Sequence, residues 1–193
     1  MALRNILTEE DPALRKVSRK VIKFDKRLHI LIDDMRETLQ DAGGVGLAAP
    51  QVGVLRRVVI VENEDGELLE LVNPEIVEMD GMQDGVEGCL SLPGKWGLVK
   101  RPNYVRVRAQ DRYGNSFEAE GWEITARCFC HETEHLDGHL FTDRAYKILT
   151  EEELAEMYAD EEEEPASEQE SEQESELEET PAGGAGAAES GEE

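Results

Sequence analysis

A change in composition near residue 160 limits how much of this chain can fold around an apolar core. Residues 160–193 contain fifteen acidic side chains, no Lys or Arg, and one large apolar residue, Leu177. Such a segment cannot bury enough apolar surface to offset the entropy lost on ordering. We therefore expect a disordered acidic tail at 160–193 and one folded domain at 1–159, which is long enough to form a core without disulfides.

Net charge and cysteine content narrow the functional classes. The formal charge is −25, and because the tail accounts for −15, residues 1–159 carry −10. This acidic body argues against general or sequence-specific nucleic-acid binding, which needs clusters of Lys and Arg. An odd count of three cysteines argues against a disulfide framework. With no secretory signal and no membrane-spanning apolar run, we expect reduced thiols and a cytoplasmic protein that does not enter membranes.

Apolar periodicity and turn residues predict an α+β order of elements. Apolar residues at three- and four-residue steps predict a helix over 25–42, which Gly43 and Gly44 end. A Gly- and Ala-rich loop follows, and Pro74 opens a separate segment after the second of two strands. The remaining predictions are strands at 57–62 and 67–72, a hairpin joining 104–109 to 117–122, and helices at 123–138 and 150–159. A helix, several short strands and a further helix are typical of an α+β fold.

The motif His-Glu-Thr-Glu-His occupies residues 131–135, on the helix predicted at 123–138. His131 and His135 are four residues apart and share a helix face, so both imidazoles can reach one metal ion. Glu132 is offset from that pair, and its carboxylate can face a water molecule instead. This arrangement is typical of metal-dependent hydrolases. A polar helix end with two unrelated histidines is the alternative.

A catalytic metal site needs a third protein ligand and an open position. His139 is one candidate, although the metzincin pattern would place its third histidine at position 141, which is Phe141. A glutamate among residues 151–153 is a second candidate, as in gluzincins, and also fits helix capping. Thiolates form the third group of candidates, namely Cys89, Cys128 and Cys130.

Three motifs in order resemble those of the bacterial peptide deformylase family. They are Gly-Val-Gly-Leu-Ala-Ala-Pro-Gln at 44–51, Glu-Gly-Cys-Leu-Ser at 87–91 and His-Glu-Thr-Glu-His at 131–135. The resemblance covers about residues 1–150 and excludes the acidic tail. Position 134 is Glu where Asp is usual, and position 130 is Cys where Gln is common. Neither position is a metal ligand in the family.

The resemblance implies small, mostly antiparallel sheets packed around a central helix that carries the two histidines. It implies Cys89, His131 and His135 as metal ligands. The ion is usually Fe²⁺ in this family, and Zn²⁺, Ni²⁺ or Co²⁺ can replace it. A thiolate with two neutral imidazoles suits such borderline divalent ions.

The implied reaction is metal-dependent hydrolysis of the formyl group from the N-terminal formylmethionine of new polypeptides, with release of formate. Glu132 would act as general base and then as general acid. The Gln51 side-chain amide and the Leu90 backbone N–H would stabilise the oxyanion. Nascent formylated polypeptides are the implied partners, the ribosome is a candidate partner, and we expect a monomer.

The substrate pocket should be apolar, with glycines that let a peptide backbone lie close. The residues expected to contact substrate are Gly44, Val45, Gly46, Trp96, Ile124 and Cys128. We expect Trp96 on a loop near the substrate path. Glu87 and Arg101 are expected to pair and to support the segment around Cys89.

Two other functional classes compete with this interpretation. A zinc endopeptidase would use the two histidines with a downstream glutamate, and it would leave Gln51 and Cys89 without a role. A non-catalytic binding domain would have lost a ligand or the base, and neither is missing.

Overall fold

The structure is a computed structural model that describes residues 2–163, with side chains described to residue 159. Its helices are η1 (Pro12–Arg15), α1 (Lys26–Ala42), η2 (Ala49–Val52), α2 (Glu123–Leu136), η3 (Phe141–Asp143) and α3 (Glu151–Glu163). Its strands are β1 (Gly46–Ala48), β2 (Val58–Glu62), β3 (Leu68–Asp80), β4 (Gln83–Gly88), β5 (Trp96–Arg101), β6 (Tyr104–Gln110), β7 (Ser116–Trp122) and β8 (Lys147–Leu149).

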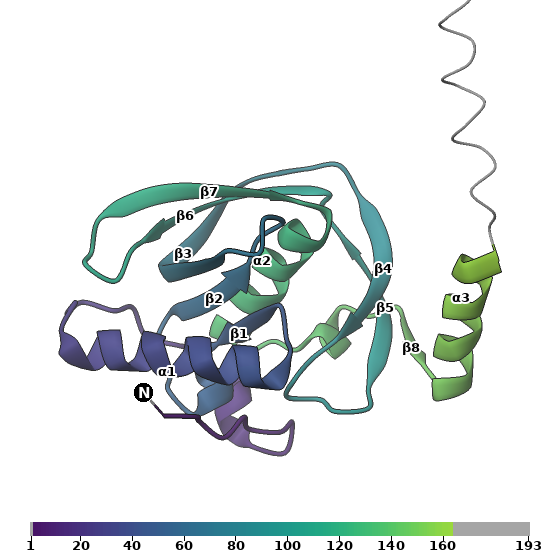
Figure 1. Ribbon diagram of the computed structural model, residues 1–193, viewed down its shortest axis with the longest axis horizontal. Helices are drawn as coiled ribbons and strands as arrows, with labels where there is room; N and C mark the ends of the chain where they lie inside the picture. Colours follow the sequence, from purple (N-terminus) through teal and green to yellow (C-terminus); the bar gives the residue numbers. More distant parts are fainter. Residues whose placement is uncertain (1, 164–193) are drawn as a thin grey trace, which may run out of the picture. The chain divides into compact units, whose positions relative to one another are not determined.

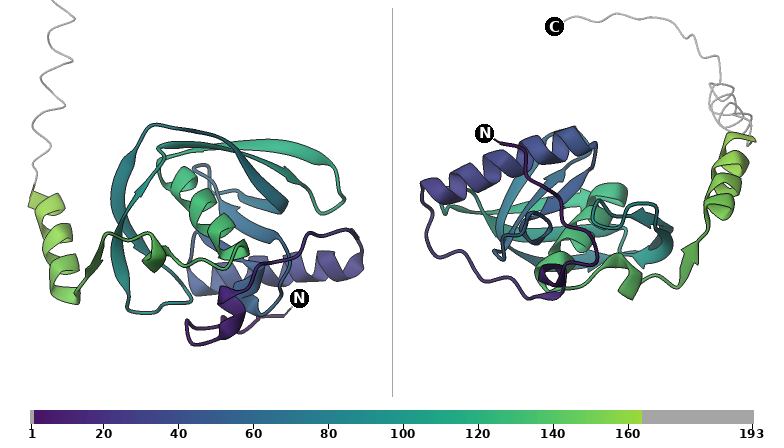
Figure 2. Two further views of the ribbon diagram at one scale, coloured as in Figure 1. Left: turned by 180° about the vertical axis from the view of Figure 1, so that it is seen from behind. Right: turned by 90° about the horizontal axis from the view of Figure 1, so that it is seen from below.

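Two antiparallel sheets surround helix α2. The larger has the strand order β1-β2-β3-β6-β7, and the smaller has the order β4-β5-β8. Helix α2 packs against strands of the larger sheet and against β5 of the smaller one, and Figures 1 and 2 show it in the interior of the body. This arrangement confirms the predicted α+β fold with a central helix.

Helix α1 matches the predicted helix within one residue at its start. The Asp25 carboxylate accepts hydrogen bonds from the backbone N–H groups of Arg27 and Leu28, which caps the first turn. Gly43 ends the helix in the left-handed conformation, with φ of 64°. The apolar face is buried against β2, where Ile32, Met35 and Leu39 belong to one core cluster with Val58 and Ile60.

Strand β3 differs from the prediction, because it runs from Leu68 through Pro74 to Asp80 as one strand. The pairing with β6 shifts register between Val72 and Glu75, and Asn73 has a positive φ of 53°. The Asn73 side chain accepts a hydrogen bond from the backbone N–H of Val21 and donates one to its carbonyl. Pro74 lacks an N–H, and it is tolerated because it lies at this bulge.

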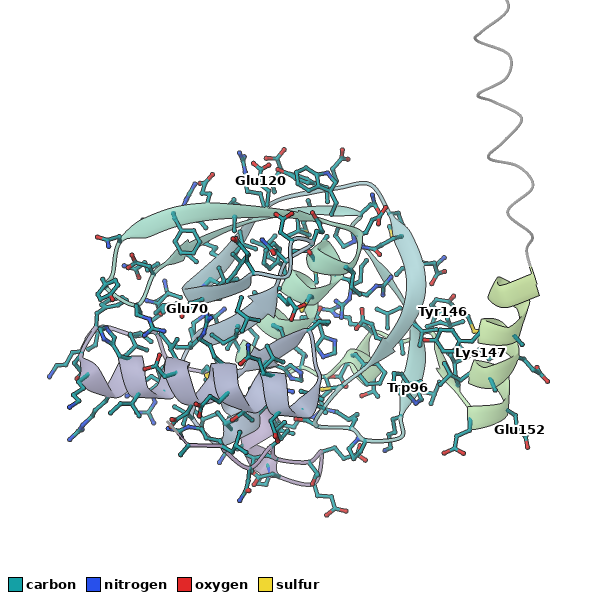
Figure 3. All side chains as sticks on the ribbon, viewed as in Figure 1. Glu70, Trp96, Glu120, Tyr146, Lys147 and Glu152 are labelled. Atoms are coloured by element: carbon teal, nitrogen blue, oxygen red, sulfur yellow. The ribbon has the colours of Figure 1, made fainter. Side chains whose placement is uncertain are left out.

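The prediction missed four short strands, β1, β4, β5 and β8. Trp96 was expected on a loop, but it is the first residue of β5, where it pairs with Gly88 of β4 and Leu149 of β8. Figure 3 shows its side chain beside the small sheet. These strands have only three to six residues each, and β1, β4 and β5 also contain glycine, so their apolar pattern is too short to be recognised.

The last predicted helix, at 150–159, corresponds to α3, which covers Glu151–Glu163 and so extends four residues further. Among the described residues, the chain divides into two units between Glu152 and Glu153. Residues 164–193, where most of the acidic tail was expected, lie outside the described residues. The predicted boundary between residues 159 and 160 therefore stays a prediction. Among the described helices, none has the length and apolarity needed to span a bilayer.

Candidate metal centre

Three potential metal ligands come together from two elements. His131 and His135 lie one turn apart on α2, and Cys89 follows β4 directly. One ligand atom from each of these residues lies within 4.8 Å of those of the other two. The Cys89 Sγ atom is 3.3 Å from His135 Nε2. Of the candidates for a third ligand, Cys89 is the one that the structure places beside both histidines, whereas His139 is exposed and faces Asp143.

The surroundings of the two imidazoles fit a bound cation. His131 directs Nδ1 at the Glu87 carboxylate, 2.9 Å away, so its Nε2 is available as a ligand atom. Burial lowers the pKa of His131, but hydrogen bonds with Cys89 and Glu87 outweigh burial and raise that pKa to about 10. Burial and the neighbouring His131 hold the pKa of His135 well below its usual value. The two rings therefore favour a single positive charge between them. A bound cation would supply positive charge there while both imidazoles stay neutral.

Glu87 orients His131 and is itself held by two arginines. Arg101 donates to both carboxylate oxygens of Glu87, at 2.8 and 3.1 Å, which confirms the predicted contact. Arg127 donates a further hydrogen bond at 2.9 Å. Burial raises the pKa of Glu87, and the hydrogen bonds from His131 and Arg101 outweigh it and lower that pKa to about 2. Glu87 is therefore a fixed anion.

Arg127 is the part of this network that the sequence analysis missed. It is a buried arginine on α2, one turn before His131, and it also donates to the carbonyl of Val99 at 3.0 Å. A cation on the buried face of the helix, four residues before a predicted ligand, was the signal that could have revealed it.

Glu132 has a different environment from Glu87. Its side chain is buried, and among the described residues its Oε2 atom has no hydrogen-bond partner. Burial raises the pKa of Glu132 to about 7, although the neighbouring His131 opposes the shift. A carboxyl group with a pKa in this range can both accept and release a proton near neutral pH.

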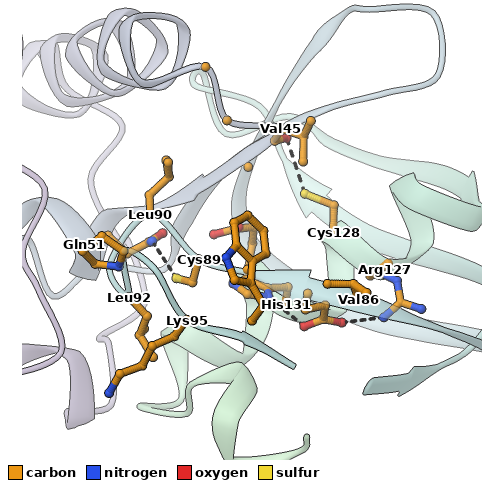
Figure 4. Close-up of a pocket in the computed structure, with 18 of the residues that line it drawn as sticks. Val45, Gln51, Val86, Cys89, Leu90, Leu92, Lys95, Arg127, Cys128 and His131 are labelled. Atoms are coloured by element: carbon orange, nitrogen blue, oxygen red, sulfur yellow. Dashed lines mark hydrogen bonds and ion pairs between the residues drawn. The ribbon is translucent and has the colours of Figure 1, made fainter. Parts of the chain in front are cut away.

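Gln51 directs its amide group toward the metal ligands. Its Oε1 accepts a hydrogen bond from the backbone N–H of Ala48 at 2.7 Å, which fixes the orientation of the amide. Its Nε2 donates to Ser91 Oγ at 3.2 Å and lies 3.5 Å from Cys89 Sγ. An N–H donor is thus held at the edge of the site, next to the Cys89 sulfur (Figure 4).

A cavity of about 460 Å³ opens beside these groups. Its walls include Gln51, Cys89, Leu90, His131 and Glu132. All of the predicted substrate contacts also line it, namely Gly44, Val45, Gly46, Trp96, Ile124 and Cys128. Figure 4 shows Val45 and Cys128 on one side, joined by a hydrogen bond from the Cys128 thiol to the Val45 carbonyl at 3.4 Å.

Two glycines of the site are required by close packing. A Cβ atom on Gly46 would lie 2.5 Å from Cys128 Sγ and 2.6 Å from Glu132 Oε1. A Cβ atom on Gly88 would lie 2.4 Å from the ring of Trp96, the cross-strand neighbour of Gly88. Because no side chain fits at either position, Glu132 and Trp96 can lie directly against the backbone.

Comparisons with known proteins identify the family of the chain. The sequence model of the family described as "Polypeptide deformylase" matches residues 3–151. A peptide deformylase of Caldicellulosiruptor bescii is 54% identical over 154 residues, which cover 80% of this chain and 92% of the relative. One from Clostridium botulinum is 56% identical over 147 residues, which cover 76% of this chain and 99% of the relative.

Solved structures show the same fold. The crystal structure of peptide deformylase from Thermotoga maritima has a TM-score of 0.73 and 37% identity, and the match covers 76% of this chain and 100% of that one. A peptide deformylase from Legionella pneumophila has a TM-score of 0.72 and 39% identity, with 85% of this chain and 100% of that one covered. On the combined evidence of sequence, fold and site, the chain belongs to the polypeptide deformylase family.

Proposed function

We propose that this chain removes the formyl group from the N-terminal formylmethionine of nascent polypeptides and releases formate and a free amino terminus. One observation carries the proposal: Cys89, His131 and His135 form a group that could hold a metal ion, beside a buried glutamate in a cavity. A divalent ion held there would act as a Lewis acid that makes water nucleophilic near neutral pH. Membership of the family supports the same reaction.

In this proposal Glu132 moves the protons. Its buried carboxylate takes the proton of the attacking water and later delivers that proton to the leaving amine. Two features support the assignment. The Oε2 atom has no partner in the described part of the chain, so no arginine holds the carboxylate in its charged form. The raised pKa, about 7, matches a group that must change protonation state in each cycle.

Gln51 and Leu90 are proposed to stabilise the charge that develops on the formyl oxygen. The Gln51 amide is fixed by Ala48 and Ser91, so little reorganisation is needed when the substrate oxygen becomes negative. Leu90 follows Cys89 in sequence and lines the same cavity, which makes its backbone N–H available nearby. The two donors come from different elements, and both lie beside Cys89.

The methionine side chain is proposed to enter the cavity. Val45, Ile124 and Cys128 provide apolar surface for it, and Trp96 packs over Gly88 at the same cavity. Gly44 and Gly46 let the peptide backbone lie close to the β1 segment. An unbranched, polarizable thioether suits such a cavity, because it adapts to irregular apolar surfaces.

The identity of the ion and the cellular context are further parts of the proposal. We propose Fe²⁺ as the working ion, with Zn²⁺, Ni²⁺ or Co²⁺ able to replace it, because one thiolate and two imidazoles suit this group of metals. We also propose a monomer that works in the cytoplasm, close to the ribosome on which its substrates are made.

The zinc endopeptidase alternative is not favoured. Its third ligand would be a glutamate downstream of α2, whereas Cys89 already faces His135 at 3.3 Å. A protease would also leave the orientation of Gln51 without purpose. The chain's relatives are named peptide deformylases.

The deciding experiment measures formate release from formyl-Met-Ala and proteolysis of an unfolded protein substrate, using one anaerobic preparation whose metal content is determined. We expect formate release, about one divalent ion per chain, and no proteolysis. Proteolysis without formate release would contradict the proposal, and so would full deformylase activity in a chain freed of metal.

A further inference from the structure

The segment before η1 contacts both of the chain segments that carry the proposed oxyanion donors. The Leu7 backbone N–H donates a hydrogen bond of 2.7 Å to the Gln51 carbonyl, and the Glu9 backbone N–H donates one of 2.9 Å to the Ser91 carbonyl. We call residues 6–9 the strap, and they belong to the dark purple segment below α1 in Figure 1. Two donors from neighbouring positions therefore reach carbonyl groups that are 40 positions apart in the chain.

The two donor-bearing segments are otherwise joined only through side chains. Within residues 2–163, no backbone hydrogen bond connects them directly. Strand β1, which leads to Gln51, pairs with β2, and β4, which leads to Cys89, pairs with β5, so the two segments belong to different sheets. Direct polar contacts between them come from the Gln51 amide, which donates to Ser91 Oγ and lies beside Cys89 Sγ. The strap is the element that connects them through the backbone.

The apolar side chains of the strap are anchored in two different core clusters. Ile6 packs against the cluster that Leu90 also contacts, and Leu7 packs against the cluster that Cys89 also contacts. Leu14, which follows the strap in η1, is fully buried in the second of these clusters. Because its side chains are held in this way, the backbone N–H groups of the strap have fixed positions.

Glu9 holds the turn that presents the proposed donor of Leu90. The Leu92 N–H donates to the Cys89 carbonyl at 2.9 Å and closes this turn. Leu90 is the second residue of the turn, and its own N–H has no hydrogen-bond partner in the described part of the chain, so it is available to a substrate. Ser91 is the third residue, and its carbonyl is bound by Glu9. The strap therefore limits how far the Leu90 N–H can move.

We propose that the strap is a positioning element that fixes the spacing between the Gln51 amide and the Leu90 N–H, an inference that rests on the deformylase function proposed above. Donors stabilise a developing oxyanion only if they are held in advance at hydrogen-bond distance from its position. No residue of the strap lines the cavity. The strap should therefore act on the transition state, and hence on kcat, and not on substrate binding.

The test removes one N–H group of the strap and keeps the local turn. Glu9 is the second residue of a turn in which the Asp11 N–H donates to the Thr8 carbonyl at 2.9 Å. Neither Glu9 nor Glu10 has a positive φ, and proline is favoured at the second position of such a turn. Glu9→Pro therefore deletes the donor to Ser91 with little strain.

Glu9→Ala is the reference variant. Like Glu9→Pro it loses the ion pair of Glu9 with Lys95, but it keeps the backbone donor. With formyl-Met-Ala as substrate, kcat of Glu9→Pro should be about tenfold below that of Glu9→Ala, a part of the hundredfold or more that loss of a whole oxyanion donor costs. KM should agree within about twofold, because uniform binding is unchanged. Metal analysis should find the same content in both.

Two further measurements separate positioning from a general loss of stability. Gly121→Ala should lower stability away from the cavity, because its Cβ would lie 2.4 Å from the Thr125 side chain, and it should leave kcat unchanged. In the full-length protein loaded with Zn²⁺, nitrogen-15 relaxation reports the mobility of single N–H groups without any need for activity. The order parameter of the Leu90 N–H should fall from about 0.85 to below about 0.6 in Glu9→Pro, while values in β2 and β6 stay high.

A second variant serves if the proline variant does not fold. Leu7→Ala keeps both N–H groups of the strap but removes its anchor in the cluster that contacts Cys89. Because small shifts of a donor cost less than the hundredfold of an ångström-scale misplacement, we expect kcat to fall by about threefold with KM unchanged.

The outcomes distinguish the strap from the proposed function. No formate release by the wild-type protein would refute the proposed function, and the order parameter of Leu90 would still test the strap. Equal kcat in Glu9→Pro and Glu9→Ala would overturn the inference, and so would an unchanged order parameter of Leu90. A rise in KM at constant kcat would also overturn it, because the strap would then serve substrate binding. An equal loss of kcat in Gly121→Ala would assign the effect to stability alone.

Discussion

Gly46→Ala should separate catalysis from stability at this site. The added Cβ atom would lie 2.5 Å from Cys128 Sγ and 2.6 Å from Glu132 Oε1. Both side chains are buried, so neither can simply move into solvent. The misfit in packing should lower the free energy of unfolding by about 1–3 kcal/mol.

The effect on activity should be larger, because the displaced group is the proposed base. An ångström-scale misplacement of a reacting group costs about a hundredfold in rate, so we expect kcat/KM for formyl-Met-Ala to fall by about that factor. The metal content should stay the same, since the three atoms nearest to the added Cβ belong to Cys128 and Glu132, which are not proposed ligands. Formate release, metal analysis and thermal unfolding measure the three quantities separately.

Two further variants sharpen this prediction. Adding Cys128→Ala to Gly46→Ala removes the contact with sulfur but leaves the contact with Glu132, so stability should recover in part while activity stays low. Gly121→Ala is the control, because its Cβ would lie 2.4 Å from the Thr125 side chain and neither residue lines the cavity, so stability should fall while activity is retained. A Gly46→Ala enzyme with nearly full activity would refute the view that Glu132 must lie against this backbone.

Other predictions address the ligands, the base, the ion and the tail. Cys89→Ala should lose bound metal and formate release together, whereas Cys130→Ala should keep both; full metal occupancy in Cys89→Ala would remove Cys89 from the ligand set. Glu132→Gln should retain metal and slow turnover by at least about a hundredfold, and purification of this variant without metal would mean that Glu132 is a ligand. In air, the Fe²⁺ enzyme should lose activity faster than the Ni²⁺ enzyme, because thiolate-bound iron is open to oxidation; equal decay of both would exclude iron lability as the cause. Truncation after Ala159 should leave kcat/KM on a short neutral formyl peptide within about twofold at moderate salt, and a large loss would show that residues 160–193 contribute to the reaction.

The elements that could be predicted from the sequence are those with a long apolar period. Helix α1 repeats its apolar residues through five turns, and the β6–β7 hairpin alternates regularly on both sides of a Gly-Asn turn. Strands β4, β5 and β8 are short, and β4 and β5 also contain glycines, namely Gly85, Gly88 and Gly97, so their pairing is determined by distant partners. The interruption at Pro74 was interpreted as a strand end because a bulge and a break have the same local sequence.

In the candidate site, too, some residues could be placed from the local sequence and others could not. The spacing of His131 and His135 on a helix is local information, so their common face could be predicted. The position of Cys89 beside them depends on the path of β4 and came only from the family resemblance. The second arginine on Glu87 was missed, although Arg127 lies four residues before His131 and so shares its helix face. Its burial becomes visible only when β4 and β5 are placed against α2.

The two buried glutamates of the centre, Glu87 on β4 and Glu132 on α2, have the same side chain but different proposed roles. Glu87 receives hydrogen bonds from Arg101, Arg127 and His131, so removing its charge would leave two buried cations poorly compensated. Glu132 has no such donor among the described residues and lies against the bare backbone of Gly46. Either protonation state of Glu132 is therefore accessible at low cost, while only the ionised state of Glu87 is. The roles of Glu87 and Glu132 therefore depend on their surroundings. The arginines beside Glu87 make it a fixed anion, and the close approach of the Gly46 backbone without a charged partner makes Glu132 a proton carrier.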